Sequence, residues 1–376
     1  MISLSQLSDA WDEKFMQEFV SVRRNALRGY TESLPETIED LRLYFDPSQA
    51  FAREHHFRAW IAHRNGKAVA RGASFVPRAW KVPPFLPFGF FEFVDDAEAA
   101  RAVLERARDF GRSLSIAELR APIDASFFGS YRLVTESRGP CLYGEPRRPD
   151  HYLRIYSEIG LEAYKHWTTF RVPVKDFLAS AEAIRSRFYP EGLPGELRFR
   201  SISGATWSED VDTVHRLFTA SYASMSEYMP ISVEAFRELY GSFRYIVDPR
   251  YSRILYRGNE AIAFFAGYHD PFRALAPVKR AAVRAPNFLG PLFSIAGLAR
   301  LKLVKGGPLA PYVGKDPKAD EVRGAMALLM REFAVNIPPD TDDFLGVYVA
   351  DGSPSLKTLP ESREALTRYA MFRLKI

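Results

Sequence analysis

Hydrophobic residues follow two periods along this chain, and these periods alternate in the same order in both halves. Apolar positions that recur every three to four residues predict helices, and short apolar runs bounded by turn residues predict strands. In the first half we expect strands at 2–4, 88–94 and 117–123, a hairpin at 57–76, a closing strand pair at 163–174, and helices at 11–27, 34–45, 97–110 and 151–159. In the second half we expect strands at 197–201, 309–314, 344–349 and 368–374, a hairpin at 252–268, and helices at 209–224, 233–239, 320–333 and 356–361.

The clearest sign of a duplication is a hairpin that occurs twice. Residues 63–70 are His-Arg-Asn-Gly-Lys-Ala-Val-Ala, and residues 256–263 are Tyr-Arg-Gly-Asn-Glu-Ala-Ile-Ala. Asn-Gly and Gly-Asn accept positive φ in a two-residue turn. Because each copy follows two helices and precedes another strand and helix, we interpret the chain as two related domains in tandem. A helical connector that ends in a Pro- and Gly-rich cluster predicts the division, with domains at 1–175 and 196–376 and the connector at 176–195.

Composition is typical of a globular protein, with 47% hydrophobic and 26% charged residues. Cys141 is the only cysteine, which excludes disulfides within the chain and cysteine-based zinc sites. The start of the sequence lacks the pattern of a secretion signal, and no apolar run is long enough to span a bilayer. We therefore expect a cytoplasmic protein.

One long segment carries only positive charge. No Asp or Glu occurs from Pro271 to Lys315, where Lys and Arg are interleaved with Phe, Leu, Ile and Val. This pattern favours contact with an anionic lipid surface or a polyanionic cofactor. A surface insertion whose apolar residues pack on its own domain is the alternative. Nucleic acid is not an expected partner, because the basic segment lies on no recognisable binding platform.

Several short motifs occur in an order and spacing that are known from one superfamily. In the first half they are Gly-Phe-Phe-Glu-Phe-Val-Asp-Asp at 89–96, Asp-His-Tyr-Leu at 150–153 and Gly-Leu at 160–161. In the second half they are Pro230, Glu234, Phe236, Asp248-Pro249, Ala263-Phe264 and His269-Asp270-Pro271. With these motifs the chain resembles the GCN5-related N-acyltransferase (GNAT) superfamily over nearly its whole length. Within it, the chain is similar to the two-domain bacterial ceramide-synthase-like acyltransferases.

The resemblance implies an α/β (α+β) fold of two GNAT-like domains, each a mixed, mostly antiparallel twisted sheet flanked by helices. It also implies an N-acyltransferase that moves an acyl group from acyl-CoA to an amine. The acyl group could be acetyl or long-chain, and the acceptor a lipid, an amino-sugar or a peptide amine in lipid or natural-product biosynthesis. Acyl-CoA would be the co-substrate, and no metal is expected. Peripheral contact with the inner membrane face through residues 271–305 is a further expectation.

GNAT domains bind the thioester between two splayed strands and its diphosphate at the start of the following helix. Both copies here depart from the usual Arg/Gln-x-x-Gly-x-Gly/Ala pattern of that helix start. In the first copy Asp95 and Asp96 would repel a diphosphate, so we expect the donor in the second half. The candidate cofactor-binding residues there are Val313, Gly314, Lys315, Lys318, Arg323, Gly324 and Ala325. An ordinary surface helix start with incidental basic residues is the alternative.

Acyl transfer needs a neutral amine, although a free alkylammonium has a pKa of about 10.4. The reaction therefore requires a base and a proton donor for the leaving thiolate. Glu92 and His151 are the candidate bases, and Tyr312 and Tyr348 are the candidate donors. A structural salt bridge of Glu92, an ordinary capped helix at His151 and a core position of Tyr312 are the alternatives.

Other enzyme classes lack their signatures in this chain. No Gly-x-Ser-x-Gly, Walker loop, His-Glu-x-x-His or dinucleotide-binding glycine motif occurs. The alternative to a transferase is a binding or scaffolding protein that keeps the GNAT fold without activity, because both diphosphate loops depart from the family pattern.

Overall fold

The computed structural model describes residues 1–30, 36–139, 141–142, 145, 147–269, 309–322, 324–339 and 341–376. The elements of the first half are β1 (Ile2–Ser8), α1 (Glu13–Ala26), α2 (Ile38–Phe45), α3 (Ala50–Arg53), β2 (His55–Arg64), β3 (Lys67–Pro77), β4 (Leu86–Phe93), α4 (Ala97–Ser113), β5 (Glu118–Ala121), β6 (Leu133–Ser137), α5 (His151–Glu158) and β7 (Glu162–Pro173). Helix α6 (Val174–Phe188) follows as the connector. The elements of the second half are β8 (Leu197–Ser201), α7 (Trp207–Tyr222), α8 (Val233–Tyr240), η1 (Gly241–Tyr245), β9 (Arg253–Arg257), β10 (Glu260–His269), β11 (Leu309–Lys315), η4 (Pro317–Asp320), α12 (Ala325–Ala334), β12 (Asp343–Ala350), η5 (Pro354–Lys357) and β13 (Glu364–Lys375).

The duplicated hairpin is confirmed in both halves. Asn65 and Gly66 adopt φ of 52° and 76° between β2 and β3, and Gly258 adopts φ of 58° between β9 and β10. Helix α2 begins four residues later than the predicted 34–45, because Thr37 and Asp40 form a capping box that fixes its start.

The described strands form two sheets. A nine-stranded sheet has the order β1-β2-β3-β4-β5-β13-β7-β12, with β6 beside β13, and a four-stranded sheet has the order β11-β10-β9-β8. Strands β4 and β5 are parallel, and the other described pairs are antiparallel. These sheets and their flanking helices confirm the predicted fold class.

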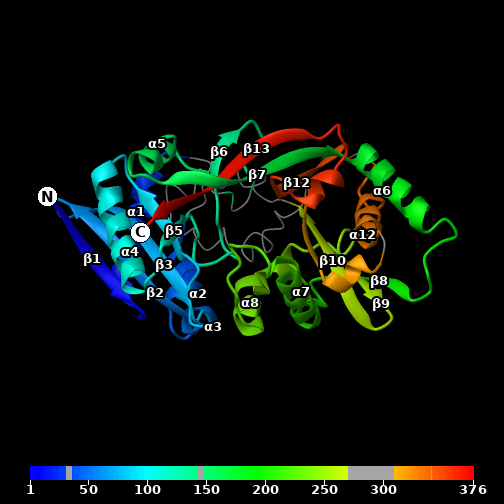
Figure 1. Ribbon diagram of the computed structural model, residues 1–376, viewed down its shortest axis with the longest axis horizontal. Helices are drawn as coiled ribbons and strands as arrows, with labels where there is room; N and C mark the ends of the chain where they lie inside the picture. The colour runs from blue at the N-terminus through cyan, green and yellow to red at the C-terminus, as the bar shows by residue number, and fades with distance from the viewer. Residues whose placement is uncertain are drawn as a thin grey trace.

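Two twelve-residue strands join the halves. The predicted strand pair at 163–174 is instead the single strand β7, which pairs with β13 on one edge and with β12 on the other. The last strand, β13, lies between β5 and β7. Figure 1 shows β7 and β13 running together along the top of the molecule to β12. Each half therefore contributes a strand to the sheet of the other, and the predicted domain boundary does not coincide with a break between sheets.

Phenylalanine side chains fill the core on the α1 side of the first sheet. Phe19 of α1, Phe45 of α2, Phe75 of β3 and Phe90 of β4 are buried, with ring centroids 4.9–6.3 Å apart. Helix α4 packs on strands β2 and β3 in a separate buried cluster. Across the described ranges, no helix is both long enough and apolar enough to cross a membrane.

Candidate active site

The sheet of the second half is open between β11 and β12. Strand β11 pairs with β10 from Ala263↔Lys315 to His269↔Leu309, whereas β12 pairs with β7. The two strands contact each other, but in the part of the chain that the structure describes they form no ladder. The GNAT resemblance predicts that the thioester binds between two neighbouring strands that do not pair with each other, as β11 and β12 do not in the described residues.

Strand β12 bulges at Tyr348, one of the predicted proton donors. This residue has φ of 53° and lies in a register shift between Gly346 and Val349. Its amide donates to Thr169 Oγ1 at 3.3 Å. A left-handed backbone at a non-glycine residue is uncommon and needs surrounding contacts to hold it. The bulge is therefore a fixed feature of the strand that borders the opening, and the donor role of Tyr348 stays a prediction.

A buried hydrogen-bond chain connects this bulge to the first half. The hydroxyl groups of Thr169 and Tyr369 are 3.0 Å apart, and the Tyr369 hydroxyl donates to the Glu145 carboxylate. Glu145 also accepts from Arg147 Nε at 2.7 Å. Burial raises the pKa of Glu145 in spite of this guanidinium. The backbone of β12 is thus held by polar groups from both halves.

In the described part of the loop from β11 to α12, several groups that could bind a diphosphate have partners within the protein. Lys315 forms an ion pair with Asp320, and its amide donates to Ser221 Oγ. The amide of Asp316 donates to Ile262 O at 2.8 Å, and the amide of Ala319 donates to Asp316 O at 2.8 Å. These amides and the Lys315 ammonium therefore already have partners within the protein.

The glycines predicted to bind cofactor have structural roles as well. A Cβ on Gly314 would lie 2.3 Å from the Phe264 ring, so this position must stay small for the sheet to pack. Gly324 has φ of 76° and precedes Ala325, the first residue of α12. The carbonyl of Val313 accepts from the Tyr222 hydroxyl at 3.1 Å. These predicted residues do lie together, and their contact with a cofactor stays a prediction.

Two other predicted site residues, Tyr312 and Lys318, lie in this region. Tyr312 pairs with Ala266 in the β11–β10 ladder, and Lys318 lies in η4. Arg323 lies outside the described residues, as does the basic segment 271–305.

Glu92, on β4, is 1% exposed and has three partners. Its carboxylate accepts from Arg148 Nη2 and from the Tyr152 hydroxyl, both at 2.7 Å, and is paired with Arg23. Burial raises the pKa of Glu92, but the nearby arginines, Arg148 first among them, outweigh burial and lower the pKa to about 2. A carboxylate held ionised in this way accepts a proton poorly at neutral pH. These contacts agree with the alternative interpretation of the sequence, in which Glu92 forms a structural salt bridge.

The corresponding opening of the first half, between β4 and β5, is filled by protein. These strands pair at Leu86↔Leu119 and Pro87↔Arg120. Beyond them the Ile123 amide donates to Phe88 O at 2.9 Å, and the Phe90 amide donates to Asp124 Oδ1 at 2.5 Å. The cavity that remains measures about 10 Å³, which is room for about one water molecule. A thioester tail would not fit there.

The start of helix α4 is likewise occupied. Asp96 accepts from the Ala99 amide at 3.0 Å and forms a bidentate pair with Arg64 at 2.6 and 2.8 Å. Its carboxylate therefore stands where an anion would bind at a helix start.

Asp124→Asn is expected to stabilise the protein at pH 8. Burial raises the pKa of Asp124 to about 6, compared with about 3.9 in an unfolded chain. Between about pH 4 and 6 the folded state thus holds a proton that the unfolded state has lost, so stability falls as pH rises through this window. We expect D124N to raise the free energy of unfolding by about 1–3 kcal/mol at pH 8 and by less at pH 5. Urea unfolding at both pH values measures this, and an equal gain at both would contradict the assignment.

His151, the other candidate base, is the first residue of α5. Its Nε2 lies 3.3 Å from Phe93 O, and its ring centroid lies 4.8 Å from that of Tyr152. Because Tyr152 also bonds Glu92, the two candidate bases lie in one cluster of the first half. The predicted cofactor-binding residues belong to the second half.

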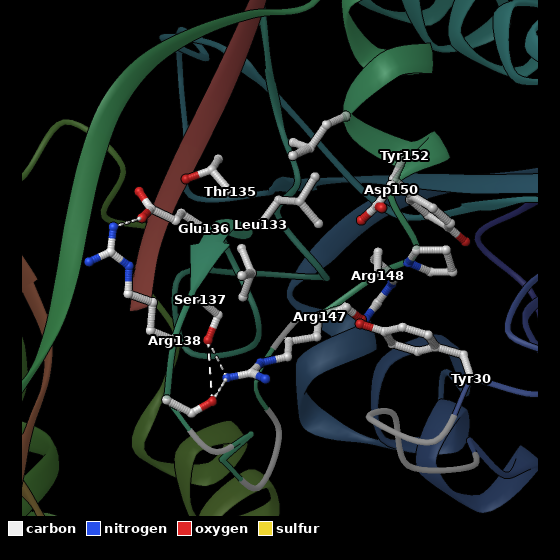
Figure 2. Close-up of a pocket in the computed structure, with 14 residues that line it drawn as sticks. Tyr30, Leu133, Thr135, Glu136, Ser137, Arg138, Arg147, Arg148, Asp150 and Tyr152 are labelled. Carbon is white, nitrogen blue, oxygen red and sulfur yellow. Dashed lines mark hydrogen bonds and ion pairs between the residues drawn. The ribbon is translucent and has the colours of Figure 1, made fainter. Parts of the chain in front are cut away.

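A polar cavity of about 380 Å³ lies beside the Glu92 cluster (Figure 2). It is bordered by β6, by the start of α5 and by Tyr30. Arg147 Nη2 donates to Ser137 Oγ at 2.6 Å and to Gly139 O at 2.9 Å. Figure 2 shows the Tyr30 hydroxyl directed toward Arg148. The cavity suits a polar ligand, and the sequence did not reveal it because its lining comes from separated segments.

Sequence reasoning also missed a group of aromatic residues around Arg132. We define the aromatic cage as Tyr131, Trp167 and Tyr348, whose rings the Arg132 guanidinium contacts. The Tyr-Arg pair at 131–132 belongs to no motif, so no signal in the sequence marks it. Within the described ranges, no group of three or more His, Cys, Asp or Glu residues could hold a metal ion.

Neither the sequence models of known protein families nor the curated protein sequences match this chain. Solved structures do match it. A conserved protein of unknown function from Enterococcus faecalis has a TM-score of 0.55 and 9% identity, covering 100% of this chain and 73% of its own. A GCN5-related N-acetyltransferase from Anabaena variabilis has a TM-score of 0.52 and 10% identity, covering 99% of this chain and 72% of its own.

A third match is the GCN5-related glucosamine N-acetyltransferase region of a fungal multi-domain beta-N-acetylglucosaminidase. Its TM-score is 0.51 with 9% identity, and the match covers 100% of this chain and 38% of the fungal one. At these identities the likeness concerns the fold, and it extends over both halves of the chain. The narrower similarity to ceramide-synthase-like acyltransferases stays a prediction. The chain has the fold of the GCN5-related N-acyltransferase superfamily.

Proposed function

We propose that this protein is an N-acyltransferase that moves an acyl group from acyl-CoA to an amine, with its thioester site in the second half. The observation that carries the proposal is the junction of β11 and β12, two contacting strands of a GNAT fold that form no ladder in the described residues. The matching place in the first half is filled by Ile123 and Asp124, which favours the second half as the donor site.

In such a reaction the amine nitrogen forms a bond to the acyl carbon while the carbon–sulfur bond breaks. One proton leaves the amine, and one is taken up by the thiolate. We propose Tyr348 and Tyr312, on the strands that border the opening, as candidates to donate that proton. His151 remains a candidate base, whereas Glu92 is better suited to its ion pairs. The positive charge for the diphosphate would come from the acid-free sequence 271–315, which includes Lys315 once its ion pair with Asp320 opens.

The acceptor class follows from chemistry common to this fold. An amine-bearing small molecule, lipid or peptide is proposed, and the fungal neighbour named for glucosamine makes an amino-sugar one of the alternatives. The basic and apolar segment 271–305 supports a long acyl chain and contact with an anionic membrane surface. A cytoplasmic location is part of the same proposal.

A specific observation also favours a second candidate function, a binding or scaffolding protein without transferase activity. The start of α4 is occupied by Asp96, and in the loop before α12 the Lys315 ammonium is in an ion pair with Asp320. The protein would then bind a polar ligand in the cavity beside Glu92, or a partner protein, and would bind no thioester.

Thermal-shift titration with acetyl-CoA and palmitoyl-CoA separates these two functions. A transferase is expected to show a rise of several degrees in Tm at saturating thioester, because a ligand that binds the folded state stabilises it. Asp320→Asn releases Lys315 from its ion pair and is expected to strengthen this response. Absence of a shift with either thioester, in wild type and D320N alike, would leave the scaffolding function.

A further inference from the structure

Arg132 is a buried cation without a hydrogen-bond partner among the described residues. Its relative exposure is 5%, and its Nε and Nη1 are both buried and unbonded. The guanidinium carbon lies 3.7 Å from the ring centre of Tyr131, 4.0 Å from that of Tyr348 and 5.2 Å from that of Trp167. The aromatic cage thus lies against the guanidinium, whose buried Nε and Nη1 have no hydrogen-bond partner among the described residues.

Among the described residues, the other two arginines of similarly low exposure have carboxylate partners. Arg71 donates to Glu36 at 2.5 and 3.0 Å, and Arg147 donates to Glu145 at 2.7 Å. A buried charge is stable when it is paired and hydrogen-bonded, and expensive when it is not. Cation–π contacts compensate part of the cost at Arg132, but they satisfy none of its N–H groups.

The position of Arg132 ties it to the opening of the second half. Tyr348 belongs to the bulge of β12, and Tyr131 stacks on Phe127 with centroids 4.9 Å apart. Phe127 in turn packs against Tyr222, whose hydroxyl bonds the Val313 carbonyl of β11. The cage therefore stands among side chains that contact both strands of the opening.

We propose that Arg132 binds a carboxylate of the acceptor, so that the acceptor is an amine that also carries an acid group, as an amino acid does. A guanidinium offers two parallel N–H groups in one plane, which match the two oxygens of a planar carboxylate. Three rings lie 3.7–5.2 Å from the guanidinium carbon, and a flat carboxylate suits the space beside them better than a tetrahedral phosphate. This inference rests on the proposed transferase function.

The test compares Arg132→Met and Arg132→Gln with the control Arg71→Met. Arg71 is also buried against an aromatic ring, but it is paired with the Glu36 carboxylate. Thermal shift is measured for each protein with glycine and 4-aminobutyrate, with glycinamide as the uncharged control, and with phosphoethanolamine against ethanolamine. We expect the carboxylates, and not glycinamide, to raise the Tm of wild type and R71M, and to leave R132M and R132Q unchanged. We also expect R132M without ligand to melt about 2 °C or more above wild type, and R71M to melt below it.

Three results would overturn the proposal. In the first, the Tm of both Arg132 variants falls as much as that of R71M, and no carboxylate raises the Tm of wild type. Arg132 would then be a structural residue. Another is a response confined to phosphoethanolamine. The third is an equal carboxylate response in wild type and both variants. A carboxylate response without any response to acetyl-CoA or palmitoyl-CoA would instead retain this site and overturn the transferase function.

Discussion

Glu92→Gln is expected to lower the free energy of unfolding by about 3–5 kcal/mol, because it removes the charge that compensates buried arginines. The Glu92 carboxylate is 1% exposed and holds Arg148 through two hydrogen bonds, at 2.7 and 3.0 Å. An amide cannot match that charge, so Arg148 would keep its desolvation cost without the attraction that offsets it. Chemical denaturation at pH 7, followed by circular dichroism, measures the loss.

The pH dependence should change as well. The pKa of Glu92 is lowered to about 2 in the folded protein, so its contribution is present above about pH 4.5 and is lost as pH falls toward 2. The free energy of unfolding of E92Q should therefore fall less than that of wild type as pH is lowered from about 4.5 toward 2. The matched control is Glu39→Gln, which removes an exposed carboxylate paired with Arg42 at 3.2 Å and should change stability by less than about 0.5 kcal/mol.

The same variant separates a structural role of Glu92 from a catalytic one. If E92Q unfolds like wild type but loses acyl transfer per folded molecule, Glu92 is the base and the ion-pair interpretation fails. If the stability falls and the folded fraction retains activity, the base lies elsewhere, with His151 as the next candidate.

Gly89→Ala is expected to destabilise the protein by about 3 kcal/mol, because the new methyl group meets backbone atoms that have no room to yield. A Cβ at this position would lie 2.0 Å from the Ile123 oxygen and 2.5 Å from the Asp124 nitrogen. The segment at Ile123–Asp124 must therefore move away from β4. Hydrogen exchange should show faster exchange at the amides of Ile123 and Phe90, whose hydrogen bonds close the opening of the first half.

The control for G89A is Gly195→Ala. Gly195 has nothing within 4 Å of an added Cβ, so its replacement should change stability by less than about 0.5 kcal/mol. Stability of G89A equal to that of G195A, with unchanged exchange at Ile123, would show that this segment does not fill the opening as described.

Local signals in the sequence predicted the hairpins and most of the helices. Asn65-Gly66 adopts the two positive φ angles that its composition demands, and Asp96 caps α4 as its position before an amphipathic run predicts. These features depend on residues within a few positions of each other. The placement of β13 between β5 and β7 depends on pairing across most of the chain, which no local pattern specifies.

The same contrast between local signals and long-range contacts holds for the candidate site. The sequence left a structural salt bridge of Glu92 open, yet its partners Arg23 and Arg148 come from distant segments that the sequence alone could not select. The candidates on β11 and in the loop after it are close in sequence, and their contact with a cofactor stays a prediction. Arg132 and its cage join three separate segments, so their meeting emerges only from the tertiary fold.

The placement of β7 and β13 in shared sheets has a consequence for folding during synthesis and for transfer of either half to another gene. During synthesis the first half lacks its inner strand until residues 364–375 leave the ribosome, so the strand edges of β5 and β7 stay unpaired until β13 has been made. Neither half can be transferred to another gene as a separate cassette without losing a strand that its sheet requires. The two halves therefore form a single folding unit, because β13 completes a sheet that begins in the first half.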